Sequence, residues 1–333
     1  MQQSQTNRSR ISRRTMLGGA AALAASPALA EDCRIGPPPH HKGPPVFLDY
    51  DQVELDASYD QVRYEPMIAR VSQRLASTSE AVRGRIGAPQ RVAYGPSEIE
   101  KLDIYRTKAA NAPVFVFVHG GLWQIGAAKD YAYPAEMFVA AGAHYVALDF
   151  TNVNDAGGDL GGMAAQVRRG IAWVAKNAAS FGGDPGRIYI GGHSSGGHLC
   201  GVALVTDWQR EFDLPADVIK GGLCMSGMYE MTPVRLSWRR AYVKFTDAMA
   251  DAMSAQRHID KLGTPIVVTY GSFETPDFQR QSRNFAAAVK SAGKPVELIE
   301  APNYAHLEMC ESLGNPYGPN GRAALTMMKL APA

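Results

Sequence analysis

The sequence has few cysteines, no surplus of charge of either sign, and no long apolar run after its first thirty residues. Only four of the 333 residues are cysteine, and they form neither a C-x-x-C pair nor the spacing of a zinc finger. Lysine and arginine number 34 and aspartate and glutamate 32, so no basic excess indicates a nucleic-acid partner. No apolar stretch after residue 30 approaches the length of a transmembrane helix. What remains is an ordinary globular composition, with 46% hydrophobic and 20% charged residues.

The first thirty residues have the composition of an export signal. Arg13 and Arg14 follow a serine, precede Thr-Met-Leu, and lead into a short run rich in Gly, Ala and Leu. Residues 28–30 (Ala-Leu-Ala) then offer the small side chains of a cleavage site. We therefore expect residues 1–30 to be a twin-arginine signal peptide read by the twin-arginine export machinery, and the mature protein to be periplasmic or secreted. An uncleaved anchor is the alternative, but the apolar run is short for a bilayer span.

Removal of this segment changes the charge but keeps every cysteine. The segment holds four arginines and no acids, so 30 basic residues would face 32 acidic ones and the formal net charge would move from +2 to −2.

The cysteines remain after this removal. Acidic residues precede Cys33, where a lipoprotein signal requires small ones, so we expect no stable membrane anchor. An oxidising compartment permits disulfides, and Cys33 with Cys310 is the first pairing to test. Cys200 and Cys224 lie in apolar segments and are expected to be buried free thiols.

Beyond the signal, the chain divides into an N-terminal extension and a longer region of alternating elements. Residues 31–85 begin with a Pro- and His-rich lead-in and continue with apolar residues at helical spacing. Residues 86–333 alternate between strand-like and helix-like segments, which predicts an α/β fold with a mostly parallel sheet covered by helices on both faces. An insertion at about 229–262, rich in aromatic and Met residues, interrupts this rhythm. We expect it to lie like a cap over the carboxyl edge of the sheet, where ligands bind.

The alternation is specific enough to place individual elements. The expected strands are 102–105, 114–118, 145–150, 187–190, 221–225, 265–270 and 296–299. The expected helices are 134–141, 163–178, 198–205, 278–291 and 321–330.

Residues 192–196 read Gly-His-Ser-Ser-Gly and fit the G-x-S-x-G pattern. An apolar strand precedes the motif and a helix follows it, which is the context of a nucleophile elbow. The sharp turn requires small residues on both sides of the serine and lifts its hydroxyl above the sheet edge. We therefore expect Ser194 to be a nucleophile. A tight strand–helix connection without chemistry is the structural alternative.

A second glycine-rich motif, residues 119–123 (His-Gly-Gly-Leu-Trp), follows the expected strand 114–118. Glycines at this place let the backbone turn N–H groups toward a reacting carbonyl, and such donors stabilise the oxyanion of a tetrahedral intermediate. The expected donors are the amides of Gly121, Leu122 and Ser195. An ordinary glycine turn is the alternative.

Together, H-G-G-x-W at 119–123 and G-H-S-S-G-G-H-L at 192–199 resemble the kynurenine formamidase (arylformamidase) branch of the α/β hydrolases. This branch is close to the hormone-sensitive-lipase-like esterases, and the similarity extends from about Leu55 to the C-terminus. The resemblance implies an α/β-hydrolase fold, a nucleophilic serine in G-x-S-x-G, and oxyanion donors at Gly121 and Leu122.

The resemblance also implies an acid after the expected strand 265–270. Matched residue by residue, the family's Asp falls on Glu274, which departs from the family pattern, although Ser-His-Glu triads occur on this fold. Asp277 is the rival acid, but it matches the family's Glu and stands where it would cap the next helix. His306 follows the last expected strand, so the order Ser194, Glu274, His306 is that of an α/β hydrolase.

Other side chains have less specific signals. His193 and His198 flank the nucleophile and are expected to shape the elbow, and His119 to brace its own loop. The remaining histidines match no motif. Three aromatic residues, Tyr59, Tyr64 and Trp123, could wall a substrate pocket, with core packing as the alternative for each.

The expected mechanism is acyl transfer through Ser194, which needs no metal and no organic cofactor. We expect a small-molecule ester substrate. An amide hydrolase acting on a formylated arylamine is the alternative, and a non-catalytic binding protein that keeps the fold is a third reading. Kynurenine breakdown is a cytoplasmic pathway, so an export signal favours the ester. The sequence leaves the physiological substrate and the oligomeric state open.

Overall fold

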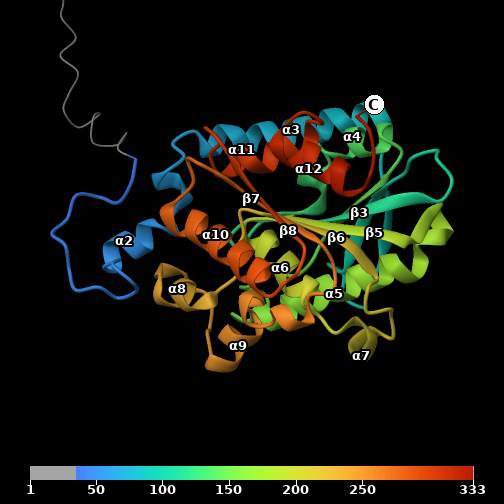
Figure 1. Ribbon diagram of the computed structural model, residues 1–333. Coiled ribbons are helices and arrows are strands. Elements are labelled where there is room, and N and C mark those ends of the chain that lie inside the picture. The colour runs from blue at the N-terminus through green and yellow to red at the C-terminus, as the bar shows by residue number, and fades with distance from the viewer. Residues whose placement is uncertain (1–34, 333) are drawn as a thin grey trace, which may run out of the picture. The chain divides into compact units, whose positions relative to one another are not determined.

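An eight-stranded sheet runs through the part of the chain that the structure describes, residues 35–332 of a computed structural model (Figure 1). The strand order is β1-β2-β4-β3-β5-β6-β7-β8. The β1–β2 and β2–β4 pairs are antiparallel, and every other pair is parallel. The strands are β1 (Gln90–Ala93), β2 (Lys101–Tyr105), β3 (Ala112–Val118), β4 (His144–Leu148), β5 (Gly183–His193), β6 (Ile219–Met225), β7 (Ile266–Gly271) and β8 (Val296–Ala301). The expected signal peptide and Cys33 lie outside the described residues.

Helices cover both faces of this sheet. In Figure 1, α3, α4, α11 and α12 lie along one face and α5 and α6 along the other. The helices are α2 (Gln52–Ala57), α3 (Ile68–Ile86), α4 (Ala135–Ala140), α5 (Leu160–Asn177), α6 (Ser195–Leu204), α7 (Trp208–Phe212), α8 (Met231–Leu236), α9 (Asp247–Ala252), α10 (Pro276–Ser291), α11 (His306–Glu311) and α12 (Pro319–Met327).

Strand β3 shows why the sheet needs cover on both faces. Side chains alternate along a strand, and those of Val114, Val116 and Val118 enter the hydrophobic core beneath α5 and α6. The side chains of Phe115 and Phe117 enter a second core beneath α3, α4 and α12. All five are fully buried, so this central strand is apolar without interruption, as is usual for a doubly covered parallel sheet.

The predicted α/β fold is confirmed, with several local differences, among them the following three. The antiparallel edge strand β1 was not expected, because its residues are mostly exposed and carry no apolar run. The helical pattern of the extension is split into α2, a 3-10 turn and α3. Pro66 accounts for the break just before α3, because a proline disfavours helical conformation in the residue before it. Helix α6 begins at Ser195, three residues before the expected start, because the small residues of the elbow are already helical.

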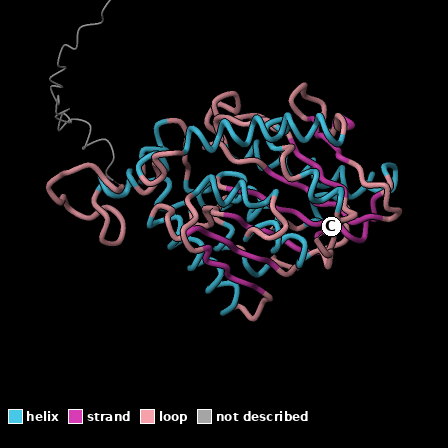
Figure 2. The backbone as a smooth tube through the Cα atoms, turned by 90° about the horizontal axis from the view of Figure 1, so that it is seen from above, coloured by secondary structure: helices cyan, strands magenta, loops and turns pink. Residues whose placement is uncertain are grey.

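The N-terminal extension contacts the insertion that follows β6. Figure 2 shows the irregular segment before α2 at one end of the molecule. Asp56 of α2 accepts a hydrogen bond from the backbone N–H of Trp238 at 2.6 Å. The side-chain amide of Gln52 donates to the carbonyl of Leu236 at 3.0 Å. The insertion holds α8, the 3-10 turn η4 (Trp238–Ala241) and α9. The extension and the insertion are therefore joined to each other.

The described cysteines are buried thiols. Cys200 and Cys224 are fully buried, as expected, and so is Cys310. The Cys310 sulfur lies 3.2 Å from the hydroxyl of Tyr133, and its suggested partner Cys33 is outside the described residues. Among residues 35–332, no helix combines the length and the apolar character needed to cross a bilayer.

Candidate active site

Ser194 stands at the tip of a strained turn between β5 and α6. Its φ of 58° and ψ of −124° are unusual for a residue other than glycine. The turn brings α6 so close to β3 that a Cβ on Gly196 would lie 2.1 Å from the carbonyl oxygen of Val118. Only glycine fits at that position. The G-x-S-x-G string therefore forms a nucleophile elbow, which holds the serine at the carboxyl end of the central strands.

Glu274 and His306 form a buried hydrogen-bonded pair. Nδ1 of His306 lies 2.8 Å from Oε2 of Glu274, and the two residues are 3% and 2% exposed. The other carboxylate oxygen, Oε1, accepts from the backbone N–H of Gly271 at 2.8 Å and from the Ser226 hydroxyl at 2.5 Å. With both oxygens occupied, the carboxylate is held in one orientation, and it in turn fixes the imidazole tautomer and ring plane.

His193 supports the same histidine from its other side. Its Nε2 lies 2.8 Å from the carbonyl oxygen of His306, and the two rings are 4.5 Å apart. Burial, and then the neighbouring His306, lower the pKa of His193 well below its ordinary value. A neutral His193 with hydrogen on Nε2 donates to that carbonyl. The role expected for His193, shaping the elbow, therefore extends to the loop that carries His306.

Asp277, the rival acid, is directed elsewhere. It is fully buried in the first turn of α10. Its carboxylate accepts one hydrogen bond from the Tyr59 hydroxyl and another, 2.6 Å long, from Nε of Arg280. It thereby ties the N-terminal extension to α10. Among the described residues, Glu274 is the carboxylate that reaches His306.

The loop after β3 has the backbone geometry of an oxyanion hole. Gly121, Leu122 and Trp123 have consecutive positive φ values of 114°, 61° and 63°. Two of these residues have side chains, so the conformation is strained and needs support. Part of that support is a hydrogen bond from the Trp123 N–H to Oγ of Ser195 at 3.1 Å. The N–H groups of Gly121 and Leu122 donate to no backbone carbonyl within residues 35–332. Ser195 opens α6, so its N–H has no acceptor within the helix.

His119 braces this loop as expected. Its Nδ1 lies 2.8 Å from the carbonyl oxygen of Gly120, and its ring stacks on those of Tyr131 and Phe150. Burial lowers the pKa of His119, so the imidazole is neutral.

A cavity of 330 Å³ brings these groups together. Ser194 and His306 both line it, as do Gly121 and Leu122 of the oxyanion loop. The serine hydroxyl and the imidazole make no hydrogen bond to each other in this state. Such contacts are often loose in a free enzyme and tighten when substrate binds. The cavity therefore brings Ser194, His306 and the loop of Gly121 and Leu122 to one place.

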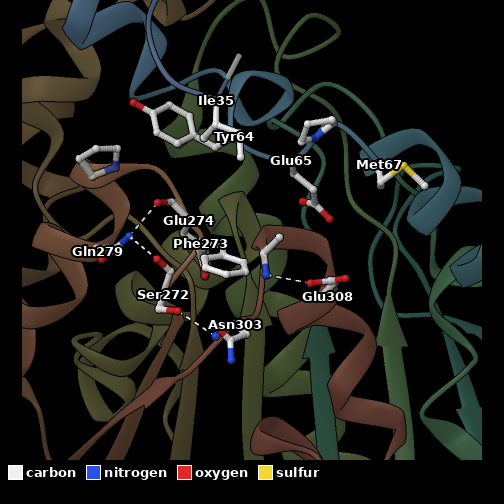
Figure 3. A pocket seen from close by; sticks show the side chains of 13 residues that line it. Ile35, Tyr64, Glu65, Met67, Ser272, Phe273, Glu274, Gln279, Asn303 and Glu308 are labelled. Atoms are coloured by element: carbon white, nitrogen blue, oxygen red, sulfur yellow. Dashed lines mark hydrogen bonds between the residues drawn. The ribbon is translucent and has the colours of Figure 1, made fainter. Parts of the chain in front are cut away.

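The three aromatic residues expected at the pocket have different positions. Tyr59 lines the cavity. Tyr64 lines a neighbouring cavity of 520 Å³, shown in Figure 3, where Glu65 and Glu274 also lie. Trp123 is a core residue, because its ring is 2% exposed and its Nε1–H donates to Nδ1 of His198 at 3.1 Å. Packing, the alternative for each aromatic, describes Trp123. It also describes Tyr59, which borders the cavity but has no exposed surface and lies in the same hydrophobic core.

Sequence reasoning missed Gln61 and Trp238, which line the cavity with Ser194. It also missed Ser226, whose hydroxyl binds Glu274. Trp238 falls in the aromatic-rich insertion that was expected over the sheet edge, so composition carried a signal for it. No local pattern marks Gln61 or Ser226.

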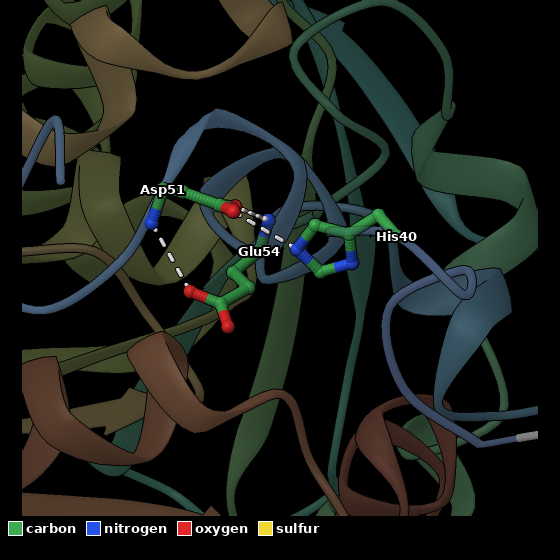
Figure 4. A group of neighbouring side chains, drawn as sticks. All are labelled: His40, Asp51 and Glu54. Carbon is green, nitrogen blue, oxygen red and sulfur yellow. Dashed lines mark hydrogen bonds and ion pairs between the residues drawn. The ribbon is translucent and has the colours of Figure 1, made fainter. Parts of the chain in front are cut away.

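A group of potential metal ligands, His40, Asp51 and Glu54, lies apart from the cavity (Figure 4). Asp51 is the N-cap of α2, and its side chain and that of Glu54 form a capping box. The backbone amides of Glu54 and Gly43 lower the pKa of Asp51 to about 2, and Glu54 pairs with Lys42. Helix capping and ion pairs account for this cluster.

Comparisons with known proteins show which families and folds this chain is similar to. The family model BD-FAE matches residues 102–221. A kynurenine formamidase of Danio rerio is 30% identical over 274 residues, which cover 78% of this chain and 90% of the relative. Esterase LipQ of Mycobacterium tuberculosis is 29% identical over 65% of this chain and 56% of its own length. Among solved structures, esterase LipW from Mycobacterium marinum superposes with a TM-score of 0.62 at 17% identity, over 80% of this chain and 88% of that one. The structural likeness supports the fold class.

Proposed function

Since this chain belongs to the kynurenine formamidase family of α/β hydrolases, we propose that it is a serine hydrolase that cleaves a carboxylic ester through an acyl-enzyme. One observation carries the proposal. Ser194 and His306 line a single cavity with the oxyanion loop, and Glu274 holds the histidine at 2.8 Å. The relatives of this chain are esterases and formamidases, and this also makes it a hydrolase.

The proposed reaction follows from the position of each group. Oγ of Ser194 bonds to the acyl carbon while Nε2 of His306 accepts its proton, and the negative charge moves to the carbonyl oxygen. The amides of Gly121, Leu122 and Ser195 stabilise that oxygen.

Collapse of the tetrahedral intermediate breaks the bond to the alcohol, which leaves with the proton from His306. A water molecule then hydrolyses the acyl-enzyme by the same route. Glu274 stabilises the imidazolium in both halves of the reaction.

Amide hydrolysis is the second candidate, and the formamidase relatives favour it. The H-G-G-x-W loop resembles that family. Three points support the ester. LipQ is an esterase, the family's acid position holds Glu274 here, and the proposed export signal would separate the enzyme from cytoplasmic metabolism. A non-catalytic binding role fits poorly with a site in which every expected catalytic position is filled.

The test is a panel of unactivated short- and medium-chain esters and N-formyl anilides, with N-formylkynurenine included. We expect kcat/KM to be higher for the esters, and Ser194→Ala to lose at least about three orders of magnitude in turnover on every substrate that the wild type cleaves. A clear preference for the formamide would replace the ester proposal with the family-typical one. A few per cent of activity left in Ser194→Ala would remove Ser194 as the nucleophile.

We also propose the cellular place and the organisation of the chain. Residues 1–30 direct export by the twin-arginine route, and the mature enzyme acts in the periplasm or outside the cell. The mature chain then consists of an extension, 31–85, and a hydrolase domain, 86–333, with the insertion at 229–262. Support for treating the extension as part of the enzyme comes from Tyr59 and Gln61, which line the cavity.

A further inference from the structure

Arg239 is a buried cation at the edge of the active site. It belongs to η4 in the insertion and has no exposed surface. Its guanidinium carbon lies between 5.2 and 5.9 Å from the centroids of four aromatic rings, those of Trp123, Tyr59, Trp238 and Phe278. These rings come from the oxyanion loop, the N-terminal extension, the insertion and α10. The guanidinium is thus enclosed by every segment that forms this end of the site.

Within residues 35–332, Arg239 has no carboxylate partner. Its one side-chain hydrogen bond runs from Nη2 to the carbonyl oxygen of Tyr59 at 3.3 Å, while Nε and Nη1 are buried without acceptors. Burial of a charge without a partner is costly, and the rings compensate only in part, by cation–π attraction.

The neighbouring acids do not neutralise this charge. Asp277 is paired with Arg280. Asp56 accepts from the backbone of Trp238 and makes no ion pair with Arg239. Two further acids near the cavity are also engaged, Glu274 with His306 at 2.8 Å and Asp60 with Arg63 at 3.7 Å. Glu65, beside His306, has its pKa raised by burial, which disfavours its charged form. Arg239 is therefore left without a direct ion-pair partner among the described residues.

This charge lies close behind the cavity wall. Tyr59 and Trp238 contact the guanidinium and also line the cavity that holds Ser194. Two more polar groups without partners are found in the same wall. Both amide atoms of Gln61 and the indole N–H of Trp238 are buried and make no hydrogen bond among the described residues. A substrate group that accepts hydrogen bonds and carries negative charge would satisfy this end of the cavity.

Resting on the proposed hydrolase function, we propose that Arg239 determines specificity for substrates that carry a carboxylate in addition to the bond that is cleaved. The carboxylate lies toward Tyr59, Gln61 and Trp238, and the ester carbonyl lies at Ser194. Arg239 attracts it through the aromatic wall, where little water screens the charge. At an effective dielectric constant of about 20, unit charges roughly 10 Å apart change an equilibrium by about tenfold.

The test compares two pairs of esters that differ mainly in one carboxylate. Mono-p-nitrophenyl adipate against p-nitrophenyl hexanoate places the charge on the acyl side. 4-Carboxyphenyl acetate against 4-(methoxycarbonyl)phenyl acetate places it on the leaving group. The readout is the ratio of kcat/KM, charged over neutral, after the rate with Ser194→Ala has been subtracted. We expect the wild type to favour the charged ester in at least one pair.

Substitutions then assign that preference to Arg239. Arg239→Met is expected to lower the ratio about tenfold, and Arg239→Lys, which keeps the charge, to retain most of it. Arg240→Met is the matched control, because Arg240 is the exposed neighbour in the same turn. It should leave the ratio unchanged. A ratio is used because loss of packing alone would slow both esters of a pair alike.

The failures are distinguishable. If the wild type cleaves both esters of each pair without favouring the charged one, this inference is overturned and the hydrolase function stands. An unchanged ratio in Arg239→Met would also overturn it. Should Arg239→Met fail to fold, the wild-type ratios can still overturn the inference. If no ester of either pair is cleaved above the Ser194→Ala rate, the proposed function itself is wrong.

Discussion

The carboxylate of Glu274 reaches His306 at 2.8 Å, whereas that of Asp277, three residues later, binds Tyr59 and Arg280. The loop between β7 and α10 separates their roles. Glu274 ends a turn in which its N–H donates to the carbonyl of Gly271, while the Gly271 N–H donates back to its carboxylate. Asp277 is already in the first turn of α10, on the side that faces the N-terminal extension. One acid serves the histidine, and the other anchors the extension.

This division predicts opposite effects of two amide substitutions. Glu274→Gln cannot stabilise an imidazolium and is expected to lower kcat/KM on an activated ester by about 10³–10⁴. Asp277→Asn is expected to cost less than about tenfold in activity, but to destabilise the fold by roughly 1–3 kcal/mol, because it disturbs buried hydrogen bonds. Steady-state kinetics and urea unfolding of both variants measure this. Comparable kinetic losses, or the reverse ranking, would move the catalytic acid to Asp277.

Buried histidines predict that stability falls in mild acid, and His198 is the best case for a test. Its Nδ1 accepts from Trp123 Nε1–H at 3.1 Å, and its Nε2 lies 3.0 Å from the carbonyl oxygen of Met253, so a second proton would oppose the Trp donor. Burial lowers the pKa of His198 to about 4. The unfolded chain therefore takes up this proton as pH falls through about 6.5, and the folded chain only near 4.

The sign follows from this order of protonation. Above pH 6.5 the contribution to stability is complete. It is lost as the pH falls from 6.5 toward 4, by up to about 1.4 kcal/mol per pH unit. His198→Asn should flatten the pH dependence of the free energy of unfolding by that slope, whatever its effect at pH 8. Urea denaturation at several pH values measures it, and an unchanged slope would show that His198 is not a buried neutral group.

The elbow predicts a large difference between two glycines. Gly196→Ala would place a methyl group 2.1 Å from the backbone oxygen of Val118, so the elbow has to shift. A shift of this size is expected to cost at least about 100-fold in kcat/KM and roughly 1–3 kcal/mol in stability.

Gly84→Ala is the control. Gly84 is in helix α3, and a Cβ added there would have no neighbouring atom within 4 Å, so alanine is expected to stabilise the protein by about 0.5 kcal/mol without loss of activity. Thermal melts and activity assays on both variants provide the comparison. Normal activity in Gly196→Ala would contradict the close approach of α6 to β3.

Export is predicted to depend on the paired arginines. Replacement of Arg13 and Arg14 together by lysine is expected to keep the protein in the cytoplasm, because the twin-arginine machinery reads the pair and not its charge. Cell fractionation with an activity assay follows the location, and N-terminal sequencing of the exported protein should begin at Glu31. Unchanged export of the double-lysine variant would exclude this route.

What the sequence by itself determined is local. The alternation of apolar strands with amphipathic helices specifies the fold class, because period and turn chemistry are set by neighbours along the chain. The Ser194 elbow and the glycine-rich loop at 119–123 are visible for the same reason, since each places small residues where one sharp turn needs them.

The tertiary structure decided what depends on contacts between distant segments. Glu274 and Asp277 are nearly adjacent in sequence, and only the packing of α10 against Tyr59, 218 residues away, assigns them different partners. Burial turned Trp123 into a core residue, and the meeting of the extension with the insertion placed Gln61 and Trp238 in the cavity wall. The same meeting enclosed Arg239, which has no carboxylate partner within residues 35–332. A sequence pattern cannot show that a buried charge lacks an ion-pair partner, because this depends on every segment that packs around the side chain.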